Sequence, residues 1–88
     1  MVMYVILVYD MEADRTQKML RLGRRYLVHV QNSVLEGEIT KGDLAELRGK
    51  IEDLLIVGES VVIYELSSES YLDRTVYGED PKTDDQFL

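Results

Sequence analysis

The chain has 88 residues, and it contains no cysteine, one histidine and one proline. Without cysteine it can form neither a disulfide framework nor a thiolate metal site, and one histidine cannot build a histidine-rich zinc site. The six glycines are scattered singly, so no glycine-rich loop is present to cradle phosphates. These absences exclude zinc fingers, zinc hydrolases and the nucleotide-binding fingerprints.

Long hydrophobic runs are also missing. The longest apolar run, residues 1–9, is shorter than the roughly 20 residues needed to cross a bilayer. It lacks the basic segment and the small-residue cleavage site of a signal peptide. We therefore expect a cytoplasmic protein with no membrane partner. A single domain of this size buries only about 60 to 65% of its unfolded surface, so dimerisation would add to a modest core.

Positive charge is scarce overall but concentrated in one place. Acidic residues outnumber basic ones by 17 to 10, and a net charge of -7 argues against non-specific binding of nucleic acid. Five of the ten basic residues nevertheless lie between positions 15 and 25, whereas residues 79–88 contain four acidic residues and one lysine. A solvated helix face with an acidic tail explains this asymmetry as well as a nucleic-acid surface does.

The hydrophobic pattern predicts the order β-α-β-β-α-β followed by an extra strand. Residues 2–9 are apolar at both parities, which is typical of a central strand buried on both faces. From residue 12 the period becomes that of an amphipathic helix whose basic residues share the outer face. The predicted elements are a strand at 2–9, a helix at 12–27, strand structure at 28–39, a helix from Thr40 that ends by Gly58, a strand at 60–66 and an edge strand at 71–77.

Two local signals refine this order. Asn32 and Ser33 form a plausible tight turn that would divide residues 28–39 into two short strands, although one long kinked strand also fits. Thr40 and Asp43 resemble the start of a capping box at the second helix.

This order predicts an α+β ferredoxin-like fold, with one antiparallel sheet and both helices on one face. The domain would span residues 1–78, and residues 79–88 would form an acidic tail. The other sheet face would be left open, and either Val5, Leu7, Val61 and Ile63 or their opposite-parity neighbours would occupy it. We therefore expect a symmetric homodimer, with the strand at 71–77 able to extend the sheet of the second copy.

Asp10 is the candidate for chemistry, because it follows a buried strand and precedes a helix. Carboxylates at such a rim often bind hard cations, but a helix cap at Asp10 or Asp14 is the more common role of an acidic residue here. One carboxylate is a poor magnesium site by itself. A two-fold axis near the strand end would bring two copies of Asp10 together, and a metal between them could activate water for attack on a phosphodiester. His29, alone within a strand, is more typical of a packed or surface residue than of a general base.

Several of these residues form a recognisable pattern. The strand ending in Tyr9-Asp10, the downstream Asp14-Arg15 and the segment His29-Val-Gln31-Asn-Ser33-Val-Leu-Glu-Gly37 resemble the small CRISPR-associated endoribonuclease family. This family is the second core protein of CRISPR adaptation and the partner of the CRISPR-associated (Cas) integrase. The resemblance covers about 78 residues in matching element order.

The resemblance implies a ferredoxin-fold homodimer and a Mg²⁺-dependent nuclease that acts on single-stranded RNA or duplex DNA. Asp10 would be its catalytic residue and metal ligand. In spacer acquisition the dimer would hold new spacer DNA, and the C-terminal strand and tail would contact the integrase. The residues implied to contact phosphates are Arg15, Lys18, Arg21 and Arg25, and those implied at the hairpin or dimer centre are Tyr9, Gln31 and Ser33.

Two positions depart from the family pattern. His29 stands where many members have arginine, and Leu35 stands where many have phenylalanine. A neutral histidine is no permanent cation, and leucine cannot stack on a base, so we expect both contributions to be missing here.

Three functions therefore stay open. The first is a non-catalytic dimeric scaffold that binds the DNA backbone and docks the integrase. The second is a metal-dependent endonuclease centred on Asp10. The third is a ferredoxin-like regulatory or toxin-type module that binds RNA or protein.

Overall fold

The computed structural model describes residues 2–67, so the predicted strand at 71–77 and the acidic tail at 79–88 lie outside the described residues. Within 2–67 the order is β-α-β-β-α-β, as predicted. The elements are β1 (Val2–Asp10), α1 (Ala13–Gly23), β2 (Val28–Gln31), β3 (Val34–Thr40), α2 (Lys41–Leu54) and β4 (Ser60–Leu66).

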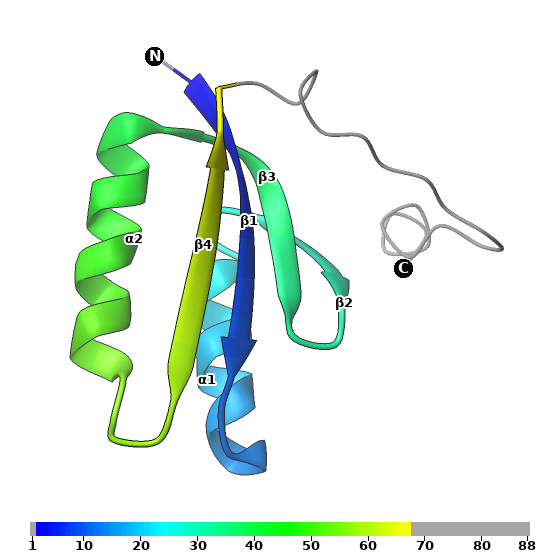
Figure 1. The fold of residues 1–88 in the computed structure, drawn as a ribbon, viewed down its shortest axis with the longest axis vertical. Coiled ribbons are helices and arrows are strands. Elements are labelled where there is room, and N and C mark those ends of the chain that lie inside the picture. Colours follow the sequence, from blue (N-terminus) through cyan, green and yellow to red (C-terminus); the bar gives the residue numbers. More distant parts are fainter. Residues whose placement is uncertain (1, 68–88) are drawn as a thin grey trace, which may run out of the picture.

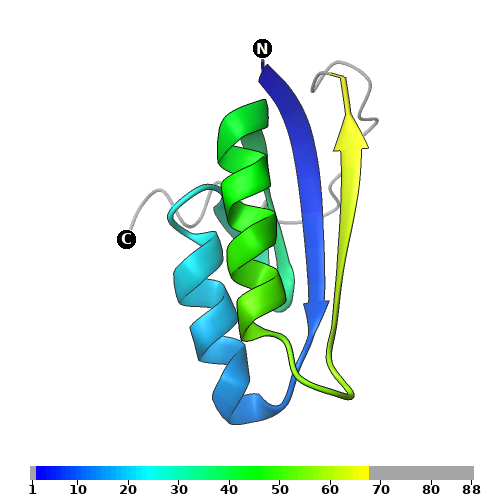
Figure 2. The same cartoon turned by 90° about the vertical axis from the view of Figure 1, so that its left-hand side faces the viewer.

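The four strands form one antiparallel sheet in the order β2-β3-β1-β4 (Figure 1). Both helices lie on the same side of this sheet (Figure 2). The predicted α+β ferredoxin-like architecture is therefore confirmed for the described residues.

Strand β1 occupies the middle of the sheet because it pairs with both β3 and β4. Its neighbours Tyr4 and Val5, which point to opposite faces, are 1% and 0% exposed. This burial explains why the strand is apolar at both parities and confirms its predicted central position.

Strands β2 and β3 form a hairpin, which excludes the single kinked strand. The connection is the predicted turn at Asn32 and Ser33, and Asn32 adopts a positive φ of 22°. Asparagine tolerates this backbone region better than most residues do. The register shifts between His29 and Gln31, so the hairpin contains a bulge next to its turn.

Helix α1 ends at Gly23, four residues before the end predicted from the apolar period. The next N–H groups still bond to the last turn: Tyr26 N and Leu27 N both donate to the carbonyl of Gly23, at 3.0 and 2.8 Å. The chain thus leaves the helix through a tight turn, and Leu27 still reaches the core, at 5% exposure. The prediction extended too far because a turn kept these apolar residues on the core side without helical geometry.

Helix α2 begins as predicted. The Thr40 side chain accepts the N–H of Asp43 at 3.1 Å, which is the expected N-terminal cap. The helix ends at Leu54, and the chain then turns at Gly58, whose φ of 94° suits glycine. Tyr26, in the turn after α1, binds α2 by donating to Glu46 Oε1 at 2.5 Å and accepting from Lys50 Nζ at 3.1 Å.

The core lies between the sheet and the helices. Its buried side chains are contributed by odd-numbered positions of β1 and β3 and by the apolar stripes of both helices. They include Val5, Leu7, Tyr9, Met19, Leu35, Ile39, Leu44, Leu47 and Ile51. No helix in the described part of the chain is long and apolar enough to cross a membrane.

The opposite face of the sheet carries the even-numbered positions of β1 and β4. The register pairs Ile6 with Tyr64 and Val8 with Val62, so these side chains share one face. Tyr64 is 57% exposed and Val62 is 45% exposed. The open face predicted from the sequence therefore has the opposite parity to Val5, Leu7, Val61 and Ile63, which pack toward the helices.

Candidate functional site

Asp10 lies at the end of the central strand, where three connections of the fold meet. It pairs across the sheet with Ser60, the first residue of β4. The β2–β3 turn and the start of β4 lie at this same end of the sheet (Figure 1). The fold thus places one carboxylate and one hydroxyl residue opposite each other at an exposed rim.

The alternative role of Asp10 or Asp14 as a helix cap is not seen. The N-cap of α1 is Glu12, and no side chain makes a cap hydrogen bond there. Asp10 is exposed, and within residues 2–67 its carboxylate forms no hydrogen bond or ion pair. Within the described chain Asp10 therefore has neither a capping role nor an ion-pair role.

Tyr9 lies in the core on the helix side of the sheet, at 2% exposure. Its hydroxyl donates to the carbonyl of Asn32 at 3.2 Å, and its backbone N–H donates to the carbonyl of Ser33 at 3.0 Å. Burial raises the pKa of Tyr9 above its ordinary value, and the positive charge of Arg24 partly offsets this. Tyr9 thus holds the hairpin turn against β1, and its side chain lies on the helix side of the sheet.

His29 also binds this turn. Its Nε2 lies 3.0 Å from the carbonyl of Asn32. Because a carbonyl only accepts, Nε2 is assigned as the protonated nitrogen. Ser33 is half-buried in the turn, and Gln31 is exposed and pairs with Val34. Within the described chain these residues lie at or beside the hairpin turn.

Leu35 occupies a different environment from the one its family position suggested. It is 0% exposed and packs in the core against Gly23 of α1. From this buried position neither a leucine nor a phenylalanine side chain could stack on a base. The leucine at this position therefore removes no exposed stacking surface in this fold.

Arg15 does not lie on an open cationic face. Its Nε donates to Glu59 Oε2 at 2.5 Å, and its Nη2 donates to the carbonyl of Leu54. The hydrogen bond from Arg15 lowers the pKa of Glu59, and the same bond raises the pKa of Arg15. The sequence separates the two residues by 44 positions, so no local pattern indicated Glu59 as a partner.

The remaining predicted cations are exposed. Lys18, Arg21 and Arg25 lie on or just after α1, and within residues 2–67 none of them forms an ion pair. Arg21 and Arg24 line a shallow pocket of about 150 Å³ together with Gln17 and Leu20. These four residues follow the i, i+3, i+4, i+7 spacing of one helix face. Gln17 and Arg24 were not among the predicted contacts, and only this shared face brings them to the pocket.

The donor set at Asp10 suits a hard cation only in part. Mg²⁺ prefers oxygen ligands and is often held by one or two carboxylates together with water and substrate phosphates. Within the described residues, no group of three or more acidic, histidine or cysteine side chains gathers to hold a metal. The oxygen chemistry fits Mg²⁺, but one described chain contributes one carboxylate, so a fuller site needs ligands from elsewhere.

The fold and these residues define a class of small α+β proteins with a free carboxylate at the end of the central strand and a cationic first helix. Comparison with known proteins identifies the family within this class. The family model of CRISPR-associated protein Cas2 matches residues 3–74. The chain therefore belongs to the Cas2 family.

Individual relatives agree with this assignment. The chain is 40% identical to the CRISPR-associated endoribonuclease Cas2 of Dictyoglomus turgidum, over 98% of this chain and 100% of the relative. It is 39% identical to the protein of the same name from Thermotoga maritima, over 98% of this chain and 99% of the relative. A crystal structure of a Cas2 protein superposes with a TM-score of 0.83 at 38% identity and covers 91% of each chain. These relatives carry an endoribonuclease name, which supports the predicted nuclease family.

Proposed function

We propose that this protein acts in CRISPR spacer acquisition as a homodimer that binds a nucleic-acid backbone, docks the Cas integrase and hydrolyses phosphodiesters at Asp10 with Mg²⁺. The observation that carries the nuclease proposal is the exposed carboxylate of Asp10, which has no structural partner in residues 2–67. The endoribonuclease names of the relatives at about 40% identity support the same reaction class.

A second copy of the chain would complete the functional unit. The open sheet face carries exposed apolar side chains, among them Val28 at 40%, Val62 at 45% and Tyr64 at 57%. Exposed apolar side chains on a small domain favour association, because burial removes their surface from water. Asp10 has the same parity as Val8 on β1, so it stands at the rim of this face. A symmetric dimer through this face would bring the two Asp10 carboxylates toward each other.

Asp10 from each copy would hold the Mg²⁺. The ion would supply an activated water for attack on the phosphodiester. In the protein, the carboxylate would orient this water. The pocket of Gln17, Arg21 and Arg24 would bind the phosphate backbone, since arginine donors match phosphate oxygens in both charge and geometry. Lys18 and Arg25 extend the same surface and would add charge that attracts nucleic acid.

The test compares Asp10→Asn with Glu52→Gln, which removes an equally exposed carboxylate on α2. Both proteins are assayed on single-stranded RNA and on duplex DNA, with Mg²⁺ and with EDTA. We expect Asp10→Asn and EDTA each to abolish cleavage, whereas Glu52→Gln cleaves like the wild type. Equal cleavage by Asp10→Asn would assign the activity to a contaminant and refute the nuclease proposal.

The non-catalytic scaffold is the second candidate. It is favoured because, within the described residues, no cluster of three or more metal-ligating side chains surrounds Asp10. It requires that Asp10→Asn keep both dimerisation and spacer acquisition. Loss of acquisition by a folded, dimeric Asp10→Asn protein would contradict it. The family assignment supports these two functions over a regulatory or toxin-type module.

Docking to the integrase is tested by co-purification with a short DNA duplex. The full-length protein is compared with a chain stopped after Gly78, which lacks the acidic tail. Retention of the integrase by the full-length chain alone would assign the docking to the tail. Failure of both forms to retain the integrase would refute the docking proposal.

A further inference from the structure

Arg15 and Glu59 form an ion pair that joins three segments at the Asp10 end of the sheet. Arg15 belongs to the first turn of α1, and Glu59 immediately precedes β4. The guanidinium contacts Glu59 at 2.5 Å and also donates to Leu54, the last residue of α2. Glu59 in turn accepts the N–H of Ile56 at 3.1 Å. One ion pair therefore ties the start of α1, the end of α2 and the turn into β4.

This ion pair is largely covered by the protein. The side chain of Glu59 is 3% exposed and that of Arg15 is 18% exposed. In contrast, the pair between Arg48 and Glu65, which also joins α2 to β4, has side chains that are 50% and 41% exposed. Removing one partner of a covered pair leaves the other charge without compensation, which is more disruptive than breaking an exposed pair.

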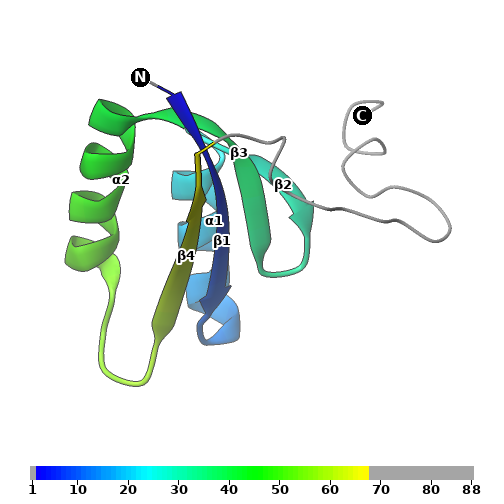
Figure 3. The ribbon, with the colours of Figure 1, turned by 45° about the horizontal axis from the view of Figure 1, so that its top comes forward.

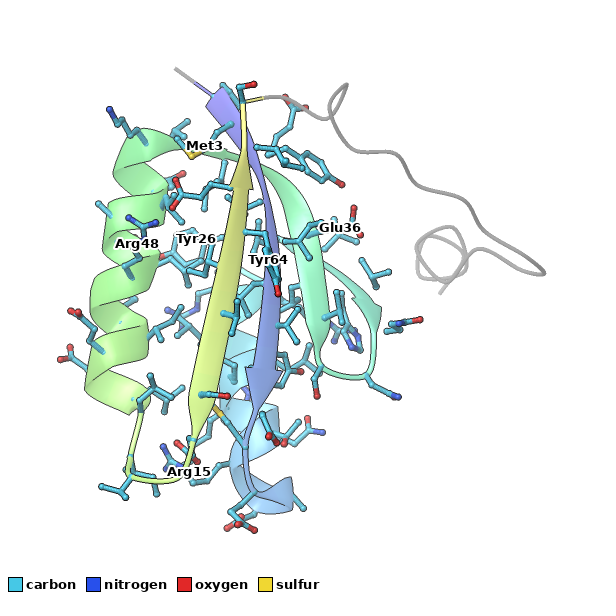
Figure 4. The ribbon with its side chains drawn as sticks, in the orientation of Figure 1. Met3, Arg15, Tyr26, Glu36, Arg48 and Tyr64 are labelled. Carbon is cyan, nitrogen blue, oxygen red and sulfur yellow. The ribbon has the colours of Figure 1, made fainter. Side chains whose placement is uncertain are left out.

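The two residues of the covered pair belong to the two chain segments next to Asp10. Ser60, the residue after Glu59, is the cross-strand partner of Asp10. Arg15 follows Asp10 by five positions and anchors the helix into which the strand leads. Figure 4 shows Arg15 at this end of the sheet and Arg48 beside α2, away from it. The pair thus fixes the two chain segments that determine where the Asp10 carboxylate stands.

We infer that Arg15 and Glu59 are positioning residues that hold Asp10 in place, and that Arg15 acts through Glu59 rather than by contacting nucleic acid. The charge of Arg15 is compensated by Glu59, whereas Arg21 and Arg24 have no ion-pair partner within residues 2–67. The part of this inference that concerns cleavage rests on the proposed nuclease function. The part that concerns the order of Asp10 does not.

The experiment uses Arg15→Gln and Glu59→Gln in the full-length chain, with Arg48→Gln as the matched control. Arg48→Gln breaks the exposed pair with Glu65, which lies five residues along β4 from Ser60, or roughly 16 Å. Three quantities are measured: amide hydrogen exchange of Asp10 and Ser60 relative to Leu7, kcat and KM for cleavage of single-stranded RNA, and the salt dependence of duplex binding. Exchange relative to a core amide separates local opening from global unfolding.

We expect both variants to accelerate exchange at Asp10 and Ser60 at least tenfold relative to Leu7. We also expect kcat to fall by about 10- to 100-fold with little change in KM, because small misplacements of a reacting group have effects of this size. The salt dependence should stay as in the wild type. Arg48→Gln should change none of these quantities.

Other results would overturn the inference. If Arg15→Gln lowers the salt slope by about one and Glu59→Gln tightens duplex binding, Arg15 is a phosphate ligand. Unchanged exchange at Asp10 and Ser60 refutes the positioning role whether or not the protein cleaves RNA. If the wild type is active and the variants exchange faster but keep its kcat, the positioning role is also refuted. If the wild type cleaves nothing but both variants exchange faster at Asp10 and Ser60, the ordering of Asp10 is supported while the nuclease proposal fails.

Discussion

The contact between α1 and the β2–β3 hairpin depends on the absence of a side chain at Gly23. A Cβ added there would lie 2.4 Å from Cδ1 of Leu35, far inside the 3.5 to 4.0 Å of a favourable carbon contact. Leu35 is 0% exposed, so its side chain cannot swing into solvent. We therefore predict that Gly23→Ala destabilises the protein, although alanine is the better helix former.

The size of this effect follows from two opposing contributions. Overpacking a well-packed core costs about 1 to 3 kcal/mol. Alanine gains at most about 1 kcal/mol over glycine in a helix, and less at its last residue. The expected net loss is about 1 to 2 kcal/mol, which lowers the Tm of a domain of this size by about 5 to 15 °C.

Gly49 provides the matched control, because it is exposed within α2 and an added Cβ meets nothing within 4 Å. Gly49→Ala should therefore raise the Tm, by about 3 to 6 °C. Thermal unfolding is followed by circular dichroism at one protein concentration, since Tm depends on concentration when a dimer unfolds. An increase in Tm for Gly23→Ala similar to that for Gly49→Ala would refute the packing argument.

Three further predictions concern charge and association. The hydrogen bond from Arg15 lowers the pKa of Glu59 below its ordinary 4.5, so this carboxylate adds stability above that pH and loses it as the pH falls through the lowered value. The Tm difference between wild type and Glu59→Gln, measured by calorimetry, should therefore be largest at neutral pH and shrink at acidic pH. An equal difference at the two pH values would contradict the prediction. The double change of Arg21→Gln and Arg24→Gln should reduce the salt slope of duplex binding, measured by fluorescence anisotropy, by about two. The exposed Lys41→Gln should not reduce it to that extent, and equal slopes for both would argue against the pocket. Val62→Lys on the open sheet face should weaken the dimer at least tenfold in sedimentation equilibrium, because burial of an ammonium group is costly. Val57→Lys, at a fully exposed loop position, should not, and equal dimerisation of the two proteins would place the interface elsewhere.

The hairpin and the two helices illustrate how far periodicity predicts this fold. The turn at Asn32 and Ser33 and the cap at Thr40 were predictable, because each depends on residues within a few positions of one another. The end of α1 was not, since Tyr26 and Leu27 continue the apolar spacing while the backbone already turns after Gly23. Apolar spacing reports which side chains face the core, and a turn can satisfy it as well as a helix does.

The cationic surface shows the same limit at the candidate site. The sequence treats the five basic residues between 15 and 25 as one outer face, because all of them fall on one half of a helical wheel. In the structure Arg15 forms an ion pair with Glu59, whereas Arg21, Arg24 and Gln17 line a pocket. Figure 3 shows the connection from α2 to β4 at the same end of the molecule as the first turn of α1, and the contacts of Arg15 with Leu54 and Glu59 join these segments.

The sequence by itself predicted the element order and the central position of β1, and it indicated Asp10 as the candidate for chemistry. Each of these depends on local alternation, on a strand end and on a recognisable motif, all of which are encoded within short stretches of chain. The tertiary structure alone decided which parity of the sheet is open, that neither Asp10 nor Asp14 caps α1, and that Glu59 pairs with Arg15. These features depend on strand register and on contacts between residues far apart in the chain, and no local pattern specifies such contacts.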